Sequence, residues 1–342
     1  MEFHPGEGNF FRSVNIAVGL VFTCLLLLVG TCCFYYVLSA ADVQSAASHD
    51  VLPPATDPAP QTVWMPPDST LIPQNAEGDL IRYGKELVAH TARYLGPRGK
   101  VMQISNGMNC QNCHLKAGTK PFGNNYAAVV STYPKFRARS GSVETIEKRI
   151  NDCLERSLNG QKLSDDSREM RAIIAWFRWV GKDVAKGTVP PGTGITSLPF
   201  LERAANPELG KLVYDKHCAV CHGAAAEGFK HPDSLEWKYP PLVGDNSYGI
   251  GAGLYRLSRF AGYVKSNMPH GTYYDKPVLT DEEAWDVAAY INSLPRPERN
   301  FPEDWPDIAA KPFDHPFGPY ADSFPESQHK FGPFGAITAS KK

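Results

Sequence analysis

The pentapeptide CQNCH at residues 110–114 recurs as CAVCH at residues 218–222. CxxCH is the attachment signal for haem c, in which both thiols form thioethers with the haem and the next histidine ligates the iron. The sequence therefore predicts two covalently bound haem c groups. The expected attachment residues are Cys110, Cys113, Cys218 and Cys221. The expected proximal iron ligands are His114 and His222.

Two other chemistries use closely spaced cysteines, namely a zinc site and a redox dithiol. Zinc would require both cysteine pairs within one domain, whereas these pairs are 108 residues apart (218 minus 110). Each motif also lies between two segments with helical spacing of apolar residues. The pattern favours a dihaem cytochrome over either alternative.

The two halves of the chain have the same organisation. In the first half, helical segments at 80–93 and 167–180 flank the motif. In the second half, the corresponding segments are 207–216 and 281–294, with Thr280 as the expected N-cap. Since there is little strand signal, we expect an all-α fold with two class I cytochrome c-like domains in tandem.

We expect the first cytochrome c domain to cover residues 79–190 and the second to cover 191–295. Residues 296–342 are rich in proline and aromatic side chains and show no periodicity. Because so much aromatic area is unfavourable in water, we expect this C-terminal tail to be an extended segment that wraps over the domains.

The N-terminal part of the chain predicts a membrane anchor. Residues 14–38 contain no charged side chain and exceed the roughly 20 residues that cross a bilayer. The expected anchor segment is 1–41, and the Pro/Ala-rich residues 42–78 read as a tether. This places the globular part on the periplasmic side of the bacterial inner membrane. The alternative is a signal peptide cleaved near residues 39–41, which would free the protein in the periplasm.

The overall charge gives no reason to expect nucleic acid as a partner, because the formal net charge is −1.

In the second unit, Met268 is the expected sixth ligand of its haem iron. It lies in Ser266-Asn267-Met268-Pro269, 46 residues after His222 (268 minus 222). This arrangement resembles class I cytochrome c, in which the thioether ligand favours electron transfer. The alternatives are a core methionine, or Lys265 or Asn267 as the ligand.

The first unit has no Asn-Met-Pro and instead carries Cys153, 39 residues after His114 (153 minus 114). A helix is expected over 143–158, with Ser142 as its N-cap. On that helix Cys153 shares a face with residues four positions before and after it, which are Arg149 and Ser157.

Arg149 and Arg156 are expected to favour the thiolate form of Cys153, which both ligates iron and acts as a nucleophile. The alternative is an inert buried cysteine. A run of basic residues surrounds this cysteine and makes a bound oxyanion plausible. The run consists of Lys135, Arg137, Arg139, Lys148, Arg149 and Arg156.

With these motifs, residues 78–335 resemble the thiosulfate dehydrogenase family of dihaem c-type cytochromes. The resemblance rests on both CxxCH motifs and on the cysteine between them. It also rests on YPKFRARSG at 133–141, RINDCLERSLNG at 149–160, NMPHG at 267–271 and the closing segments FGPYADSF at 317–324 and QHKFGPFG at 328–335.

The resemblance implies an enzyme that joins two thiosulfate ions into tetrathionate and releases two electrons, with the reverse reaction in some members. It implies that Cys153 is the distal ligand of the first haem and carries a sulfur adduct of thiosulfate. It further implies that Arg139 and Arg149 hold the anions and that Ser157 lines the pocket. The first domain is then catalytic, and the second passes electrons to a small c-type cytochrome or a membrane redox partner.

Two other functions fit parts of the sequence. A membrane-anchored dihaem electron carrier explains Met268 but leaves Cys153 and the arginines without a role. A SoxA-like sulfur-oxidising cytochrome also uses a cysteine-ligated haem but acts on a cysteine of a carrier protein. The Asn-Met-Pro sequence of the second unit argues against it.

Overall fold

Helix α2 (Ala76–Ala89) packs against α7 (Arg168–Val180) and forms the frame of the first unit. The side chain of Asn75 accepts a hydrogen bond from the Gly78 N–H, and Ser167 accepts one from the Met170 N–H, so both helices begin at a capping residue. The predicted helix over 80–93 therefore begins earlier. It ends at Ala89 and is followed by the short α3 (Thr91–Leu95). The computed structural model describes residues 28–29, 31, 62–232 and 235–341.

Helices α8 (Pro207–His217) and α11 (Asp281–Ser293) form the corresponding pair in the second unit. Asn206 caps α8, and Pro207 occupies the first turn, where its missing N–H costs no hydrogen bond. Thr280 and Glu283 form a capping box at α11, because each side chain accepts a hydrogen bond from the backbone N–H of the other. The predicted cap at Thr280 is confirmed, and Ser167, predicted as the first residue of its helix, is the N-cap of α7.

Both helix pairs approach closely at a glycine. A Cβ atom on Gly84 of α2 would lie 1.8 Å from the carbonyl oxygen of Ala172 in α7. One on Gly210 of α8 would lie 1.9 Å from the carbonyl oxygen of Asp286 in α11. The same contact thus occurs in both units and supports the tandem arrangement that the sequence predicts.

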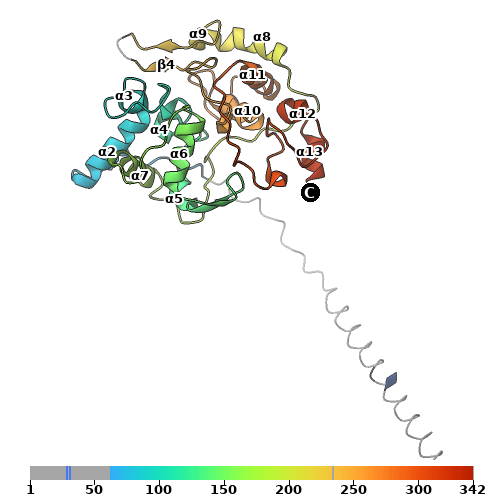
Figure 1. Cartoon of the computed structure of the whole chain (residues 1–342), viewed down its shortest axis with the longest axis horizontal. Helices are drawn as coiled ribbons and strands as arrows, with labels where there is room; N and C mark the ends of the chain where they lie inside the picture. Colours follow the sequence, from blue (N-terminus) through green and yellow to red (C-terminus); the bar gives the residue numbers. More distant parts are fainter. Residues whose placement is uncertain (1–27, 30, 32–61, 233–234, 342) are drawn as a thin grey trace, which may run out of the picture. The chain divides into compact units, whose positions relative to one another are not determined.

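The other helices of the two units are no longer than α8, and Figure 1 shows several of them beside these pairs. In the first unit they are η1 (Ser69–Leu71), η2 (Cys110–Asn112), α4 (Leu115–Gly118), α5 (Val129–Thr132) and α6 (Ile146–Arg156). In the second unit they are α9 (Ala219–His222), η3 (Gly253–Tyr255) and α10 (Leu257–Asn267). Helix α10, whose C-cap residue is Met268, was not predicted from the sequence.

The all-α prediction is wrong in one respect, because the fold contains two short antiparallel hairpins. Strand β1 (Lys135–Arg137) pairs with β2 (Ser142–Glu144), and β3 (Phe229–Lys230) pairs with β4 (Trp237–Tyr239). Three-residue strands give too few alternating positions to stand out in a sequence. The fold is therefore helix-rich rather than purely helical.

The first hairpin also corrects the predicted start of the helix that carries Cys153. Ser142 belongs to β2 and is not an N-cap. Helix α6 begins at Ile146, where the Thr145 hydroxyl accepts a hydrogen bond from the Lys148 N–H. The hairpin forms because Gly141 adopts a φ of +62°, a conformation that side chains disfavour, and because the aromatic Phe136 faces the β-branched Val143.

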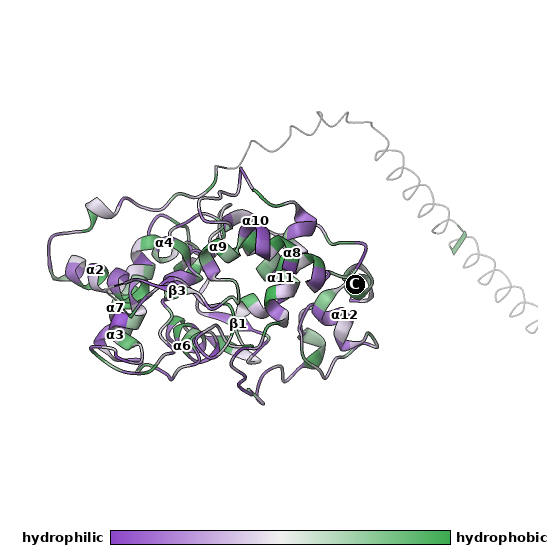
Figure 2. Ribbon diagram, turned by 90° about the horizontal axis from the view of Figure 1, so that it is seen from above, coloured by the Kyte–Doolittle hydropathy of each residue, from purple (hydrophilic) through white to green (hydrophobic). Residues whose placement is uncertain are grey.

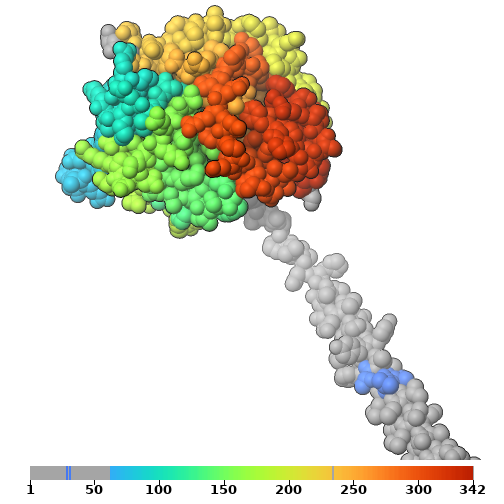
Figure 3. Space-filling view, in the orientation of Figure 1, coloured from blue at the N-terminus to red at the C-terminus, as the bar shows by residue number. Residues whose placement is uncertain are grey.

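The C-terminal tail lies against both units but is not fully extended, since it contains three short helices. They are η4 (Ile308–Ala310), α12 (Glu326–Phe331) and α13 (Gly335–Ser340). Phe334 and Ile337 are buried against the second unit, and Asp304 forms a bidentate ion pair with Arg156 of the first. Figure 3 shows the orange and red tail residues as a continuous surface beside the green ones of the first unit.

The described helices bury their apolar sides, which Figure 2 shows as green on helices such as α6 and α11, while much of the connecting chain is purple. The predicted membrane helix over 14–38 lies almost entirely outside the described residues, as does most of the predicted tether. Among the residues that the structure describes, no helix is both long and apolar enough to cross a membrane.

We predict that Gly210→Ala lowers the stability of the protein by about 1–3 kcal/mol, because the added methyl group meets backbone of α11 that cannot easily move. Gly335→Ala is the control, since no atom lies within 4 Å of the position its Cβ would take. Thermal unfolding followed by circular dichroism measures both. Equal midpoints for the two variants would contradict the close-packing argument.

Candidate haem sites

The first CxxCH motif opens into a cavity of about 360 Å³, within the range that buries cofactors in proteins. Cys110, Cys113 and His114 line it from η2 and the residues that follow. Arg149 and Cys153 line it from α6, one helical turn apart. The structure therefore brings the motif and the lone cysteine to one cavity, although 39 residues separate Cys153 from His114 (153 minus 114).

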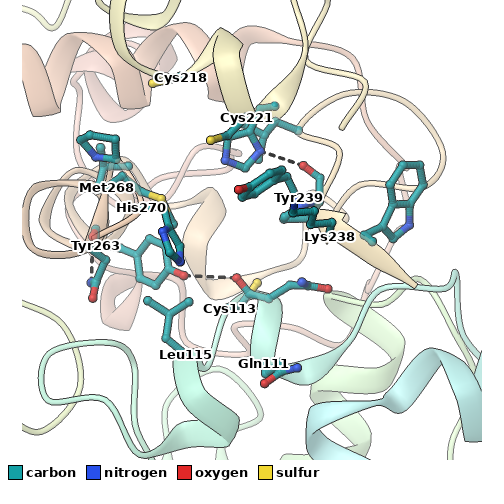
Figure 4. Close-up of a pocket in the computed structure, with 18 of the residues that line it drawn as sticks. Gln111, Cys113, Leu115, Cys218, Cys221, Lys238, Tyr239, Tyr263, Met268 and His270 are labelled. Atoms are coloured by element: carbon teal, nitrogen blue, oxygen red, sulfur yellow. Dashed lines mark hydrogen bonds between the residues drawn. The ribbon is translucent and has the colours of Figure 1, made fainter. Parts of the chain in front are cut away.

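The second CxxCH motif opens into a cavity of about 670 Å³. Figure 4 shows Cys221 and Met268 projecting toward this cavity from different elements, with Cys113 of the first motif on another side. Met268 follows α10 directly, so the C-terminal end of that helix sets the position of its thioether. The structure thus brings Met268 and His222 to the same cavity.

Both motif histidines are oriented by the same second contact. The Nδ1 atom of His114 lies 2.5 Å from the carbonyl oxygen of Asn124, and that of His222 lies 2.9 Å from the carbonyl oxygen of Pro240. An Nδ1–H that donates to a carbonyl fixes the tautomer that leaves Nε2 free to bind a metal. Burial lowers the pKa of His114 to about 4, so its imidazole is neutral, as a ligand must be.

The two alternative ligands of the second site are held differently from Met268. The Lys265 ammonium lies 2.6 Å from Asp281 and donates to the Leu279 carbonyl, and Lys265 is not among the described residues that line the cavity. Asn267 does line the cavity, but its amide donates to the Phe122 and Tyr263 carbonyls. Of these three candidate ligands, Met268 alone lines the cavity and has no side-chain hydrogen bond among the described residues.

The motif cysteines fit covalent attachment better than thiol chemistry. All four are unpaired and lie beside the cavities. Burial raises the pKa of Cys110 to about 11 and those of Cys113 and Cys218 to about 12, whereas a redox dithiol needs a thiolate at neutral pH. The residues that the structure describes also contain no cluster of three or more His, Cys, Asp and Glu side chains that could hold a zinc ion.

Arg149 and Cys153 form the central contact of the first cavity. The Arg149 Nη1 lies 3.2 Å from the Cys153 sulfur. The charge on that sulfur raises the pKa of Arg149, and burial only partly opposes this effect. Arg149 and Cys153 therefore share one face of α6, as their spacing predicts, and Ser157 on the next turn also lines the cavity.

Arg139 lines the same cavity, where burial first, and then Arg156 and Arg149, lower its pKa to about 10. The expectation that Arg156 acts on Cys153 is not supported. Its guanidinium instead donates two hydrogen bonds to Asp304 of the tail, at 2.6 and 2.7 Å. A partner 148 positions away is invisible to helical spacing.

Three further arginines of the cavity were not assigned a role from the sequence, namely Arg137, Arg256 and Arg259. Arg137 belongs to the basic run that the sequence shows. Arg256 lies between η3 and α10 of the second unit and Arg259 lies on α10, both far from the first motif in the sequence. No spacing rule connects them to Cys153.

The two cavities share a wall, because Cys113, Asn109, Tyr248 and Leu254 line both of them. The Tyr263 hydroxyl of α10 donates to the Asn112 carbonyl of the first motif at 3.2 Å (Figure 4). The two cavities are therefore adjacent.

Comparison with known proteins identifies both units. Residues 100–184 match the family described as SoxA/TsdA, cytochrome c domain, and residues 207–295 match cytochrome c. The thiosulfate dehydrogenase of Psychrobacter arcticus is 37% identical over 248 residues, which cover 72% of each chain. That of Allochromatium vinosum is 36% identical over 235 residues, which cover 68% of this chain and 83% of the relative.

A solved structure is also similar. The as-isolated form of the thiosulfate dehydrogenase (TsdBA) from Marichromatium purpuratum has a TM-score of 0.63 and 32% sequence identity. The match covers 69% of this chain and 50% of that one, so this protein spans half the length of that chain.

Proposed function

The chain belongs to the thiosulfate dehydrogenase family, and we propose that it is a dihaem cytochrome that couples two thiosulfate ions into tetrathionate. It carries two covalently bound haem c groups, one in each cytochrome c unit. The observation that supports the activity best is the 3.2 Å contact of Arg149 with Cys153, in the cavity that His114 also lines.

In this proposal the residues of each site have separate roles. His114 and Cys153 ligate the first haem iron, and His222 and Met268 ligate the second. A bound haem c accepts one electron at a time, and its potential depends on these axial ligands. Cysteine thiolate and methionine thioether differ in charge, so the two sites differ in redox properties although their scaffolds are alike.

The proposed reaction balances in two steps at Cys153. The thiolate sulfur and the outer sulfur of one thiosulfate form a sulfur–sulfur bond and release two electrons. A second thiosulfate then attacks the outer sulfur of this adduct, which forms tetrathionate and restores the Cys153 thiolate. Haem groups held at the two motifs would accept the two electrons released in the first step, one each, and an external acceptor would take them from the protein.

The arginines reduce the electrostatic repulsion between the reactants, all of which are anions. Two dianions and a thiolate repel one another strongly at contact distance. Arg149 beside the sulfur and Arg139 at the cavity wall supply fixed positive charge, and Ser157 adds a hydroxyl. Because these donors are held before the substrate binds, little reorganisation is needed when negative charge gathers there.

The second unit passes the electrons on, in our proposal to a small c-type cytochrome or a membrane redox partner. Residues 14–38 form an anchor that holds the protein on the periplasmic side of the inner membrane, or a signal segment that directs it to the periplasm. A dihaem carrier without a substrate would share Met268 and the anchor. It would not require a guanidinium against Cys153.

We predict that Cys153→Ala keeps both haem groups attached but lowers tetrathionate formation on the order of a thousandfold or more, because the nucleophile is lost. Haem content is read from the absorption spectrum, and product is measured with thiosulfate and an artificial one-electron acceptor. Unchanged turnover in this variant would refute the mechanism. If neither the wild-type protein nor Cys153→Ala forms tetrathionate although both have intact haem spectra, the electron-carrier function is favoured.

We predict that Arg149→Gln raises the KM for thiosulfate about tenfold or more, since a hydrogen bond between charged groups is lost. Arg178→Gln is a matched control, because Arg178 is exposed on α7 and does not line the described cavity. Steady-state kinetics at constant ionic strength compares the two. A wild-type KM in Arg149→Gln would contradict the anion-binding role.

We predict that Met268→Ala shifts the midpoint potential of the second haem and leaves that of the first unchanged, because only one axial ligand is removed. Met108→Ala is the control, since Met108 is buried and lines the same cavity. A spectroelectrochemical titration resolves the two haem groups. If Met108→Ala gave the larger shift, Met268 would not be the ligand.

A further inference from the structure

The residues that line the first cavity carry more positive than negative charge, and the roles assigned above do not account for all of the positive charge. Among the residues that line it in the described part of the chain, six are arginines and a single one, Asp152, is a carboxylate. The arginines are Arg137, Arg139, Arg149, Arg156, Arg256 and Arg259. Since guanidinium groups away from water are costly unless they are paired, the partner of each one matters.

On the wall formed by the hairpin and α6, two arginines have carboxylate partners. The Arg137 Nε lies 3.9 Å from the buried Glu144. Arg156 forms the bidentate pair with Asp304, at 2.6 and 2.7 Å. The protein itself therefore supplies a carboxylate beside each of these two charges.

Two further arginines are also occupied. Arg149 lies against the sulfur of Cys153. The Arg256 Nε donates to Asp314 at 2.7 Å, and the other oxygen of this carboxylate accepts hydrogen bonds from the backbone N–H and hydroxyl of Ser258. Asp314 is buried, and these contacts use both of its oxygens.

Arg139 and Arg259 remain without an anionic partner. In residues 62–232 and 235–341, no carboxylate lies within 4.0 Å of either guanidinium and neither donates a hydrogen bond to the protein. Burial lowers the pKa of both groups, and the neighbouring Arg256 adds to this effect at Arg259. Arg139 is assigned to thiosulfate above, whereas Arg259 has no role so far.

We infer that Arg259 binds an anionic group inside the first haem site, either a propionate carboxylate of the haem or the sulfonate end of thiosulfate. A planar guanidinium pairs with either group through two parallel hydrogen bonds. Only the thiosulfate source rests on the proposed function, because a propionate would be present whatever the protein oxidises.

The surroundings of Arg259 place it beside the backbone that orients His114. A Cβ atom on Gly194 would lie 3.9 Å from its Nη2. The Gly194 carbonyl accepts the Asn124 N–H at 2.8 Å, and the Asn124 carbonyl in turn accepts from His114. Because Arg259 and Met268 lie on one helix and its C-cap, α10 contributes to both haem sites.

The test compares Arg259→Gln with Arg178→Gln, which makes the same change on the exposed side of α7. Each full-length protein is loaded with haem, and two quantities are measured: the midpoint potential of the first haem and the affinity for thiosulfate, titrated calorimetrically on the fully reduced protein, which cannot take up further electrons. Binding is measured apart from turnover. A wild-type protein that bound thiosulfate without oxidising it would defeat the proposed function but would leave this comparison valid.

The two sources of the anion give different results. If Arg259 holds a propionate, Arg259→Gln lowers the midpoint potential of the first haem and leaves thiosulfate affinity unchanged, because a nearby positive charge favours the reduced state. If it holds thiosulfate, the affinity falls about tenfold and the potential stays. Values equal to those of Arg178→Gln in both measurements would overturn the inference.

A second variant covers the case in which Arg259→Gln fails to take up haem. Arg259→Lys keeps the positive charge but loses the planar pair of donors. We expect a smaller change in the same direction in one of the two measurements. Wild-type values in both would again reject an anion site at Arg259.

Discussion

The contact between the Arg149 guanidinium and the Cys153 sulfur is the interaction on which the catalytic unit depends. It holds a positive charge against a sulfur in a cavity that also receives five other arginines. Such a cavity lowers the stability of the folded protein, because charged groups lose their hydration there. The hairpin supplies Glu144, and the C-terminal tail supplies Asp304 and Asp314, so that these carboxylates balance part of this charge. What remains positive is available to anions.

The two units show how one scaffold can serve two purposes. Each pairs a helix before the CxxCH motif with a helix after it, and each pair meets at a glycine, Gly84 or Gly210. Each holds its motif histidine through a backbone carbonyl. The units differ in the residue offered to the other side of the haem cavity, which is Cys153 in one and Met268 in the other. In the proposed function, the different roles of the two units depend on this one exchange and on the charges around it.

The sequence predicts those parts of the structure that depend on nearby residues. The cap at Thr280, both haem motifs and the shared face of Arg149 and Cys153 follow from short spacings. Contacts between distant residues were missed. Ser142 looked like an N-cap because a hairpin of three-residue strands leaves almost no periodic signal. Arg156 was assigned to Cys153 because its partner in the tail is 148 positions away, and Arg259 reaches the first cavity only through packing of the second unit.

The central claim is that Cys153 is a ligand of the first haem, in a site that Arg149 keeps positively charged. Electron paramagnetic resonance of the fully oxidised wild-type protein tests this most directly, because a thiolate ligand gives a low-spin signal distinct from that of a histidine–methionine pair. The account predicts two low-spin species in equal amounts, one of thiolate type and one of histidine–methionine type. A spectrum with two histidine–methionine species and no thiolate signal would contradict it.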